Sequence, residues 1–156
     1  MIKPEMIENL MTRMRDAFQF FHLLSDDELR EFLSYCEFRQ VTSGVLWDEG
    51  EIGNYAAFMV SGKVGVKKET EFEGRYMIVG SLSPGAVIGE LCLLNNVERS
   101  ASAVVLDPVD MVTLDNQNFE QLMVKYPHLG LKVLRHIFLV LAGRLRKSND
   151  RLAKIF

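Results

Sequence analysis

A chain of 156 residues is long enough to bury a core but short for two domains, so we expect one domain over residues 1–156. It is 48% hydrophobic and 25% charged with a net charge of −3, which excludes a protein whose main work is coating nucleic acid. The N-terminus lacks the apolar run of a signal peptide, charges interrupt the most apolar later segment, and two cysteines are too few for a disulfide framework, so we expect a cytoplasmic protein without a membrane span.

Helical periodicity marks residues 4–36. One apolar stripe at spacings of three and four predicts a single helix face: Ile7, Leu10, Met14, Phe18 and Phe21. Ser25 precedes three acidic residues that end in Glu28, which has the form of a capping box. A second helix is therefore predicted to start there and to run through Leu33.

Short strands separated by glycine-containing turns occupy residues 38–115. The strand-length pieces are VLWDEG, YAAFMVSG, KVGVKKE, RYMIVGSL, SASAVVL and DMVTLD. Many short strands at such intervals are typical of an all-β sandwich, jelly roll or barrel. Residues 116–156 return to helix, because NQNFEQLMVKY ends before Pro127 and a long segment without proline follows from about Leu129.

The long final segment carries an apolar repeat with alternating spacings of four and three: Leu134, Phe138, Leu141, Leu145, Leu152 and Ile155, with Ser148 at the remaining position. Such a heptad seam predicts a homodimer through this helix. The alternative is that the stripe packs on the chain's own β region. Five basic residues lie in the same segment, and we interpret them as a solvated face rather than a nucleic-acid contact: Arg144, Arg146, Lys147, Arg151 and Lys154.

The stretch GELCLLNNVERSA, residues 89–101, places an acid near one end and a base near the other end of a mostly apolar segment. Gly89 lacks a Cβ and lets the backbone approach a ligand, and a short helix that starts at Glu90 offers unpaired N–H groups to an anion. Arg99 and Ser100 supply a guanidinium fork and a hydroxyl for a phosphate. Glu90 would repel a phosphate but can accept a hydrogen bond from a sugar hydroxyl. The residues therefore predict an anion attached to a polyol, and a cyclised ribose phosphate fits both ends.

Residues 84–105, PGAVIGELCLLNNVERSASAVV, resemble the phosphate-binding cassette of cyclic nucleotide-binding domains, and most closely that of the catabolite activator protein branch. The resemblance extends back to the strand FMVSGKV and forward to Arg144-Leu145, so that it covers roughly residues 15–155. Together with the pattern of elements it implies an α+β fold. An antiparallel β-roll or jelly roll (a double-stranded β-helix) would be flanked by N-terminal helices and a long C-terminal helix.

The resemblance also implies a role for each candidate residue. Glu90 would bind the ribose 2′-hydroxyl, Arg99 and Ser100 would bind the cyclic phosphate, and the backbones of Gly89 and Cys92 would line it. Ser148 and Asn149 of the long helix would contact the base, some of these contacts coming from a partner subunit. The predicted ligand-binding residues are Gly89, Glu90, Leu91, Cys92, Arg99, Ser100, Ala101, Ser148 and Asn149. We expect cAMP or cGMP as the ligand, with both bases open, and no cofactor.

The sequence contains no Gly-x-Ser-x-Gly motif, no His-Glu-x-x-His motif and no Walker loop, so we expect recognition rather than hydrolysis, no metal site and no enzyme activity. Activators of the similar branch carry a helix-turn-helix after the long helix, whereas this chain ends at Phe156, and we therefore expect no direct DNA binding. Another departure is Glu98, which stands where many members have proline.

These expectations combine into a cyclic nucleotide-binding regulatory domain that dimerises through its last helix. It would signal to an unidentified protein partner by reorienting that helix. Two alternatives stay open: a dimerisation module of the same fold that binds no ligand, and the effector half of a truncated transcription regulator.

Overall fold

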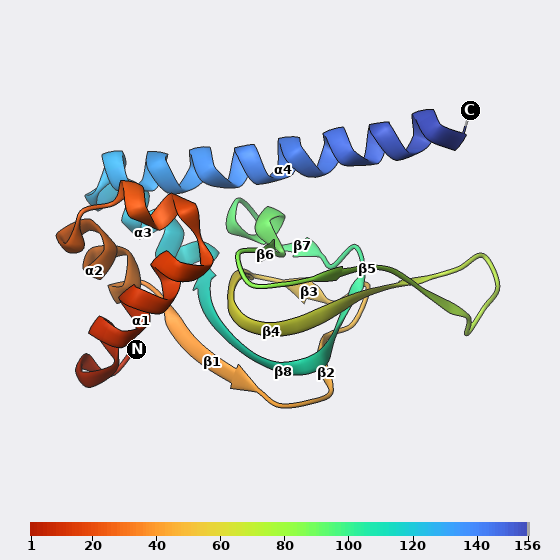
Figure 1. The fold of residues 1–156 in the computed structure, drawn as a ribbon, viewed down its shortest axis with the longest axis horizontal. Helices are drawn as coiled ribbons and strands as arrows, with labels where there is room; N and C mark the ends of the chain where they lie inside the picture. The colour runs from red at the N-terminus through yellow and green to blue at the C-terminus, as the bar shows by residue number, and fades with distance from the viewer. Residues whose placement is uncertain (156) are drawn as a thin grey trace.

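The structure, a computed structural model, describes residues 1–155 and consists of a β-roll with helices at one end and along one side (Figure 1). The helices are α1 (Pro4–Ala17), the 3₁₀ helix η1 (Gln19–Leu23), α2 (Asp26–Ser34), the 3₁₀ helix η2 (Glu90–Leu93), α3 (Asn116–Lys125) and α4 (Pro127–Ile155). The strands are β1 (Glu37–Val41), β2 (Val45–Trp47), β3 (Ile52–Gly53), β4 (Tyr55–Glu69), β5 (Tyr76–Leu82), β6 (Val87–Ile88), β7 (Val97–Glu98) and β8 (Ser102–Asp115).

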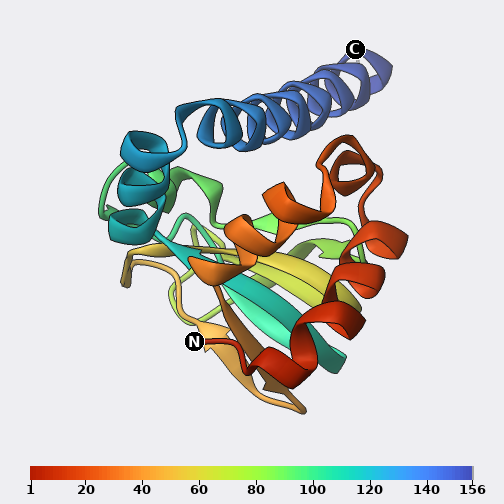
Figure 2. The same cartoon turned by 90° about the vertical axis from the view of Figure 1, so that its left-hand side faces the viewer.

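The strands confirm the predicted antiparallel roll. The larger sheet has the order β1-β8-β4-β5, with β2 paired to β8 and β6 paired to β4, while β3 and β7 form a small second sheet. Helices α1, α2 and α3 gather at one end of the roll, and the β4–β5 hairpin projects from the opposite end (Figure 1). Viewed from the helical end, α4 lies across the roll on the side of α2 and α3 (Figure 2).

Two of the strands are longer than the sequence predicts. YAAFMVSG and KVGVKKE form the single strand β4, and SASAVVL (from its third residue, Ser102) and DMVTLD lie in the single strand β8. The expected breaks at Gly62 and Pro108 lie against each other, where the β4–β8 register shifts three times between Met59 and Val64. Because both strands are irregular at the same place, the ladder continues through it. Strand β1, Glu37–Val41, was not predicted as a separate piece.

The prediction that the apolar residues from Ile7 to Phe21 lie on one face of a single helix is wrong. Helix α1 ends at Ala17, Phe18 has an extended backbone, and Phe21 lies in η1. Tertiary packing overrides the periodicity, since Phe18 and Phe21 place their rings 5.8 and 6.0 Å from that of the fully buried Phe58 on β4.

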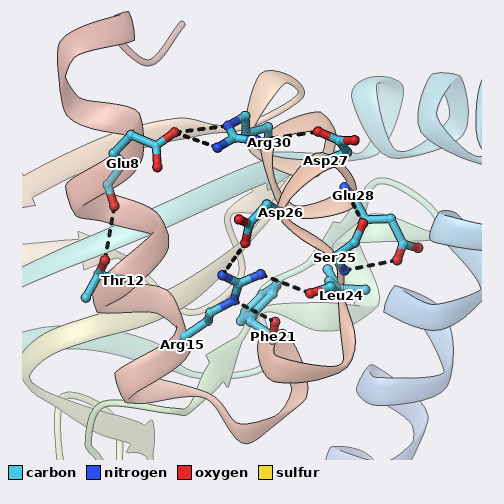
Figure 3. Close-up of polar contacts among 10 residues, drawn as sticks. All are labelled: Glu8, Thr12, Arg15, Phe21, Leu24, Ser25, Asp26, Asp27, Glu28 and Arg30. Atoms are coloured by element: carbon cyan, nitrogen blue, oxygen red, sulfur yellow. Dashed lines mark hydrogen bonds and ion pairs between the residues drawn. The ribbon is translucent and has the colours of Figure 1, made fainter.

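Arg15 stabilises the turn that follows α1 (Figure 3). Its Nε donates to the carbonyl of Phe21 at 3.2 Å, its Nη2 to the carbonyl of Leu24 at 3.0 Å, and its Nη1 to the carboxylate of Asp26 at 2.6 Å. Beside it, Ser25 and Glu28 bond reciprocally, which confirms the predicted capping box at the start of α2.

Helix α4 is anchored by its first half. Val133 and Ile137 are buried in the core that the helices share with the roll. Lys132 donates to the carboxylate of Glu28 at 2.8 Å, and this hydrogen bond is the main reason why the pKa of the Glu28 carboxyl lies below its usual range. The C-terminal half of α4 extends above β7 and β5 in the view of Figure 1.

The predicted heptad seam divides between two environments. Leu134 and Leu141 are half-buried and pack against the chain's own core, as the alternative interpretation expected. The other apolar members are exposed, and Leu131 extends their row by one heptad: Leu131, Phe138, Leu145, Leu152 and Ile155. None of the helices in residues 1–155 combines the length and hydropathy needed to cross a membrane.

Candidate functional site

The segment 84–101 forms a loop whose two ends are fixed by the sheets. Strand β6 pairs with β4, and Gly89, with φ of 73°, turns the chain from β6 into η2. After η2, strand β7 pairs with β3, and Arg99 bonds both ways to that segment: its N–H donates to Glu51 O at 2.7 Å and its carbonyl accepts from Gly50 N–H at 2.9 Å. The main chain of Arg99 is therefore set by the roll and not by the loop.

Arg99 is a charged residue in a buried position without hydrogen-bond acceptors for its Nη atoms. Only 5% of it is exposed, and neither Nη atom has a hydrogen-bond partner among residues 1–155. Its guanidinium carbon lies 3.8 Å from the ring centroid of Trp47 and 4.7 Å from that of Tyr55. These faces attract a cation but satisfy none of its N–H donors. A buried guanidinium without acceptors is costly, so the geometry calls for an anion with several oxygens.

Two glycines make room for this guanidinium. A Cβ built on Gly53 or on Gly89 would come closer than 3.0 Å to side-chain atoms of Arg99. Gly53 lies on β3 and was not among the predicted site residues, whereas Gly89 was predicted to allow a close backbone approach to a ligand. In the structure, the group that comes closest to Gly53 and to Gly89 is the side chain of Arg99.

Glu90 lies on the same side of the loop, and its carboxylate is engaged by α4. Arg144 Nη1 donates to Glu90 Oε1 at 2.9 Å, and Arg144 Nη2 donates to the carbonyl of Val87. The Glu90 side chain is 11% exposed and that of Arg144 36%. The prediction that Arg144 belongs to a solvated basic face is wrong, because its guanidinium binds Glu90 and the carbonyl of Val87. No local pattern could reveal the contact, because the two residues are 54 positions apart.

Other strands position the end of the loop. Lys68 on β4 donates to the carbonyl of Ser100 and to the carboxylate of Glu49, both at 2.6 Å. The hydrogen bond from Lys68 is the largest cause of the lowered pKa of the Glu49 carboxyl. Trp47 Nε1 donates to the carbonyl of Ala101 at 3.1 Å. The hydroxyl of Ser100 takes part in none of these contacts and lies in the exposed part of the loop.

A cavity of about 810 Å³ lies between this loop, β5 and α4. Eight of the nine predicted residues line it: Gly89, Glu90, Leu91, Cys92, Arg99, Ser100, Ala101 and Ser148. Asn149 does not line it in this chain, because one step along a helix turns a side chain by about 100° away from Ser148. The N–H of Cys92 donates to Gly89 O at 3.1 Å, so this N–H is used inside the turn.

The described residues contain no candidate metal site. No group of three or more His, Cys, Asp or Glu side chains within residues 1–155 could hold a metal ion. Besides basic side chains of α4, the cavity offers one buried cation without acceptors, one carboxylate and an apolar wall. This set can bind an anionic organic ligand and fix its orientation.

Comparisons with known proteins agree with this chemistry. The family model of the cyclic nucleotide-binding domain matches residues 42–126. The cyclic AMP receptor protein of Thermus thermophilus is 31% identical over 130 residues, which are 83% of this chain and 58% of that relative. The CRP-like cAMP-activated global transcriptional regulator of Mycobacterium tuberculosis is 30% identical over 107 residues, 69% of this chain and 46% of that relative.

A solved structure extends the likeness to most of the chain. The crystal structure of a cyclic nucleotide-binding domain from Methylobacillus flagellatus matches with a TM-score of 0.83 at 27% identity, covering 94% of this chain and 85% of that one. The present chain spans about half the length of the two curated relatives.

Proposed function

Because the chain belongs to the cyclic nucleotide-binding domain family, we propose that it is a regulatory domain that binds cAMP or cGMP in the cavity between the roll and α4. The observation that carries the proposal is Arg99, a buried guanidinium with two Nη groups that lack acceptors. A cyclic phosphate supplies those acceptors and a neutralising charge. The ribose would then lie beside Glu90, with the base toward α4.

The same contacts suggest how binding would be transmitted. Arg144 connects α4 to the loop through Glu90 and the carbonyl of Val87. A ribose hydroxyl that donates to Glu90 would enter this contact directly, and the ligand would change how α4 is held. Shifting a two-state equilibrium from 1:99 to 99:1 requires about 5.5 kcal/mol of differential binding. Charge-assisted hydrogen bonds contribute about 1.5–3 kcal/mol each, so two or three state-specific contacts suffice.

The proposal includes a homodimer through α4. Support comes from the row of exposed apolar side chains on the helix: Leu131, Phe138, Leu145, Leu152 and Ile155. An exposed apolar row at heptad spacing is typical of a helix that pairs with another helix. A partner protein would read the orientation of the paired helices.

Binding is tested by isothermal titration of the purified chain with cAMP and with cGMP. We expect saturable binding of at least one nucleotide, and loss of that binding in Arg99→Ala. Arg146→Ala is the matched control, because it removes the same charge at an exposed position that does not line the cavity. Absence of heat with both nucleotides would instead favour a dimerisation module of the same fold that binds no ligand. Equal affinities of Arg99→Ala and wild type would remove Arg99 from the site.

A second candidate is the effector half of a longer transcription regulator. The names of the two curated relatives, each about twice as long as the matched part of this chain, favour it. Sequencing the gene beyond the codon for Phe156 tests it. A helix-turn-helix in the continued reading frame would support it, and a stop codon there would exclude it.

A further inference from the structure

The side of α4 that faces the roll changes character along the helix. The inward residues follow alternating spacings of four and three: Val133, Ile137, Val140, Arg144, Lys147 and Arg151. Val133 and Ile137 are 0% and 5% exposed. From Val140 on, every member of the row lines the cavity. The face that packs on the core in the first half of the helix therefore presents three cations to the cavity in the second half.

These three cations are not equivalent. Arg144 is committed to Glu90 and Val87, whereas Lys147 and Arg151 form no ion pair within residues 1–155. Both are exposed at the rim of the cavity. With a rise of 1.5 Å per residue, they lie roughly 5 and 10 Å beyond Arg144 along the helix axis. Along α4, Lys147 and Arg151 are thus the charged residues that line the cavity beyond Arg144, the residue that binds Glu90.

We infer that Lys147 and Arg151 read the edge of a purine and make the domain prefer cGMP over cAMP, an inference that rests on the proposed function. With the phosphate at Arg99 and the ribose at Glu90, the base lies toward this part of α4. An ammonium and a guanidinium are donors only. Guanine presents two acceptors on one edge, O6 and N7, whereas adenine presents N7 and the N6 amine, which is itself a donor.

The neighbouring groups do not reverse this preference. Ser148 can donate or accept, so its hydroxyl serves either base equally. Adenine would place its amine against two cations, and guanine would place a carbonyl oxygen there. Charge-assisted hydrogen bonds to such oxygens are stronger than neutral ones. Lys147 and Arg151 therefore distinguish guanine from adenine by the group at C6, a carbonyl oxygen in guanine and an amine in adenine.

The test is a titration of the full chain with cGMP, cAMP and cIMP. Hypoxanthine keeps O6 and N7 but lacks the exocyclic amine of guanine. We expect cGMP and cIMP to bind with similar affinity and each about tenfold or more tighter than cAMP. Lys147→Gln and Arg151→Gln should each reduce this ratio, because a glutamine amide can accept as well as donate.

Arg146→Gln is the matched control, since it removes the same charge from the same helix at a position that does not line the cavity. It should leave the ratio of affinities unchanged. If neither cAMP nor cGMP binds, the proposed function fails and this inference with it. If cAMP binds as tightly as cGMP or tighter, or if cIMP behaves like cAMP, only the inference is overturned. An equal loss of discrimination in Arg146→Gln would also overturn it, because the effect would then be one of general charge.

Discussion

Replacing Gly89 with alanine should weaken ligand binding by more free energy than it costs the fold. Gly89 has φ of 73°, where an L-residue costs about 1–2 kcal/mol. Its new Cβ would also lie closer than 3.0 Å to the guanidinium of Arg99. That group is the far end of a flexible side chain, so it can move away, but the move takes it from its position against the rings of Trp47 and Tyr55.

The size of the effect follows from the contacts of Arg99. If its two Nη groups each make one charge-assisted hydrogen bond to the phosphate, their loss costs about 3–6 kcal/mol. At 1.4 kcal/mol per factor of ten, the affinity should fall by roughly 10²- to 10⁴-fold. Stability should fall only by the backbone strain of about 1–2 kcal/mol.

Gly74→Ala is the control that separates strain from displacement. Gly74 has φ of 75°, nearly that of Gly89, but a Cβ there has no atom within 4 Å. Urea unfolding should show similar losses of stability in the two variants, and titration with cAMP and cGMP should show the large loss of affinity in Gly89→Ala alone. A Gly89→Ala protein that binds within threefold of wild type would refute the placement of the phosphate at Arg99.

Two further predictions concern α4. Leu145→Asp places a charge in the exposed apolar row and should convert a dimer into a monomer, as measured by analytical ultracentrifugation; an unchanged mass would place the interface elsewhere. His136 stacks on Phe20 at 4.4 Å, its Nε2 has no partner within residues 1–155, and burial lowers the pKa of its imidazole below 6.5. The unfolded chain therefore binds the proton first as the pH falls, so wild type loses stability below about pH 6.5. His136→Phe keeps the stacking and should remove this part of the loss in urea unfolding between pH 7.5 and about 5; equal pH slopes would contradict the assignment.

The candidate site could be predicted where its residues are neighbours in sequence. Glu90 and Arg99 belong to one loop, and the charge types alone indicated a sugar hydroxyl and a phosphate. The surroundings of Arg99 could not be predicted, because Trp47, Gly53 and Tyr55 come from other strands and carry no pattern that points to a cation. Nothing in their local sequence distinguishes them from residues that only pack in the roll.

The fold shows the same limit in its helices. Periodicity correctly predicted that α4 is long and amphipathic, but a period does not say what covers each face. Leu141 packs on the chain's own core while Leu145, one turn later, is exposed. Phe18 continues the apolar spacing of α1, yet the helix ends before it, and its ring contacts that of Phe58 from an extended backbone. Both outcomes depend on tertiary contacts that a spacing cannot contain.

Helix α4 places the cavity and the exposed apolar row on two faces of one rigid segment. Beyond Ile137, the side-chain hydrogen bonds from residues of α4 up to 155 to the rest of the chain are those of Arg144. Two hydrogen bonds from one partly exposed guanidinium, beside the packing of Leu141, are a weak attachment for half a long helix. Because an α-helix rotates as a body, a turn that withdraws Arg144 from Glu90 also moves Leu145 and Leu152. We therefore expect a ligand that competes for Glu90 to move the cavity face and the exposed apolar row of this half of α4 together.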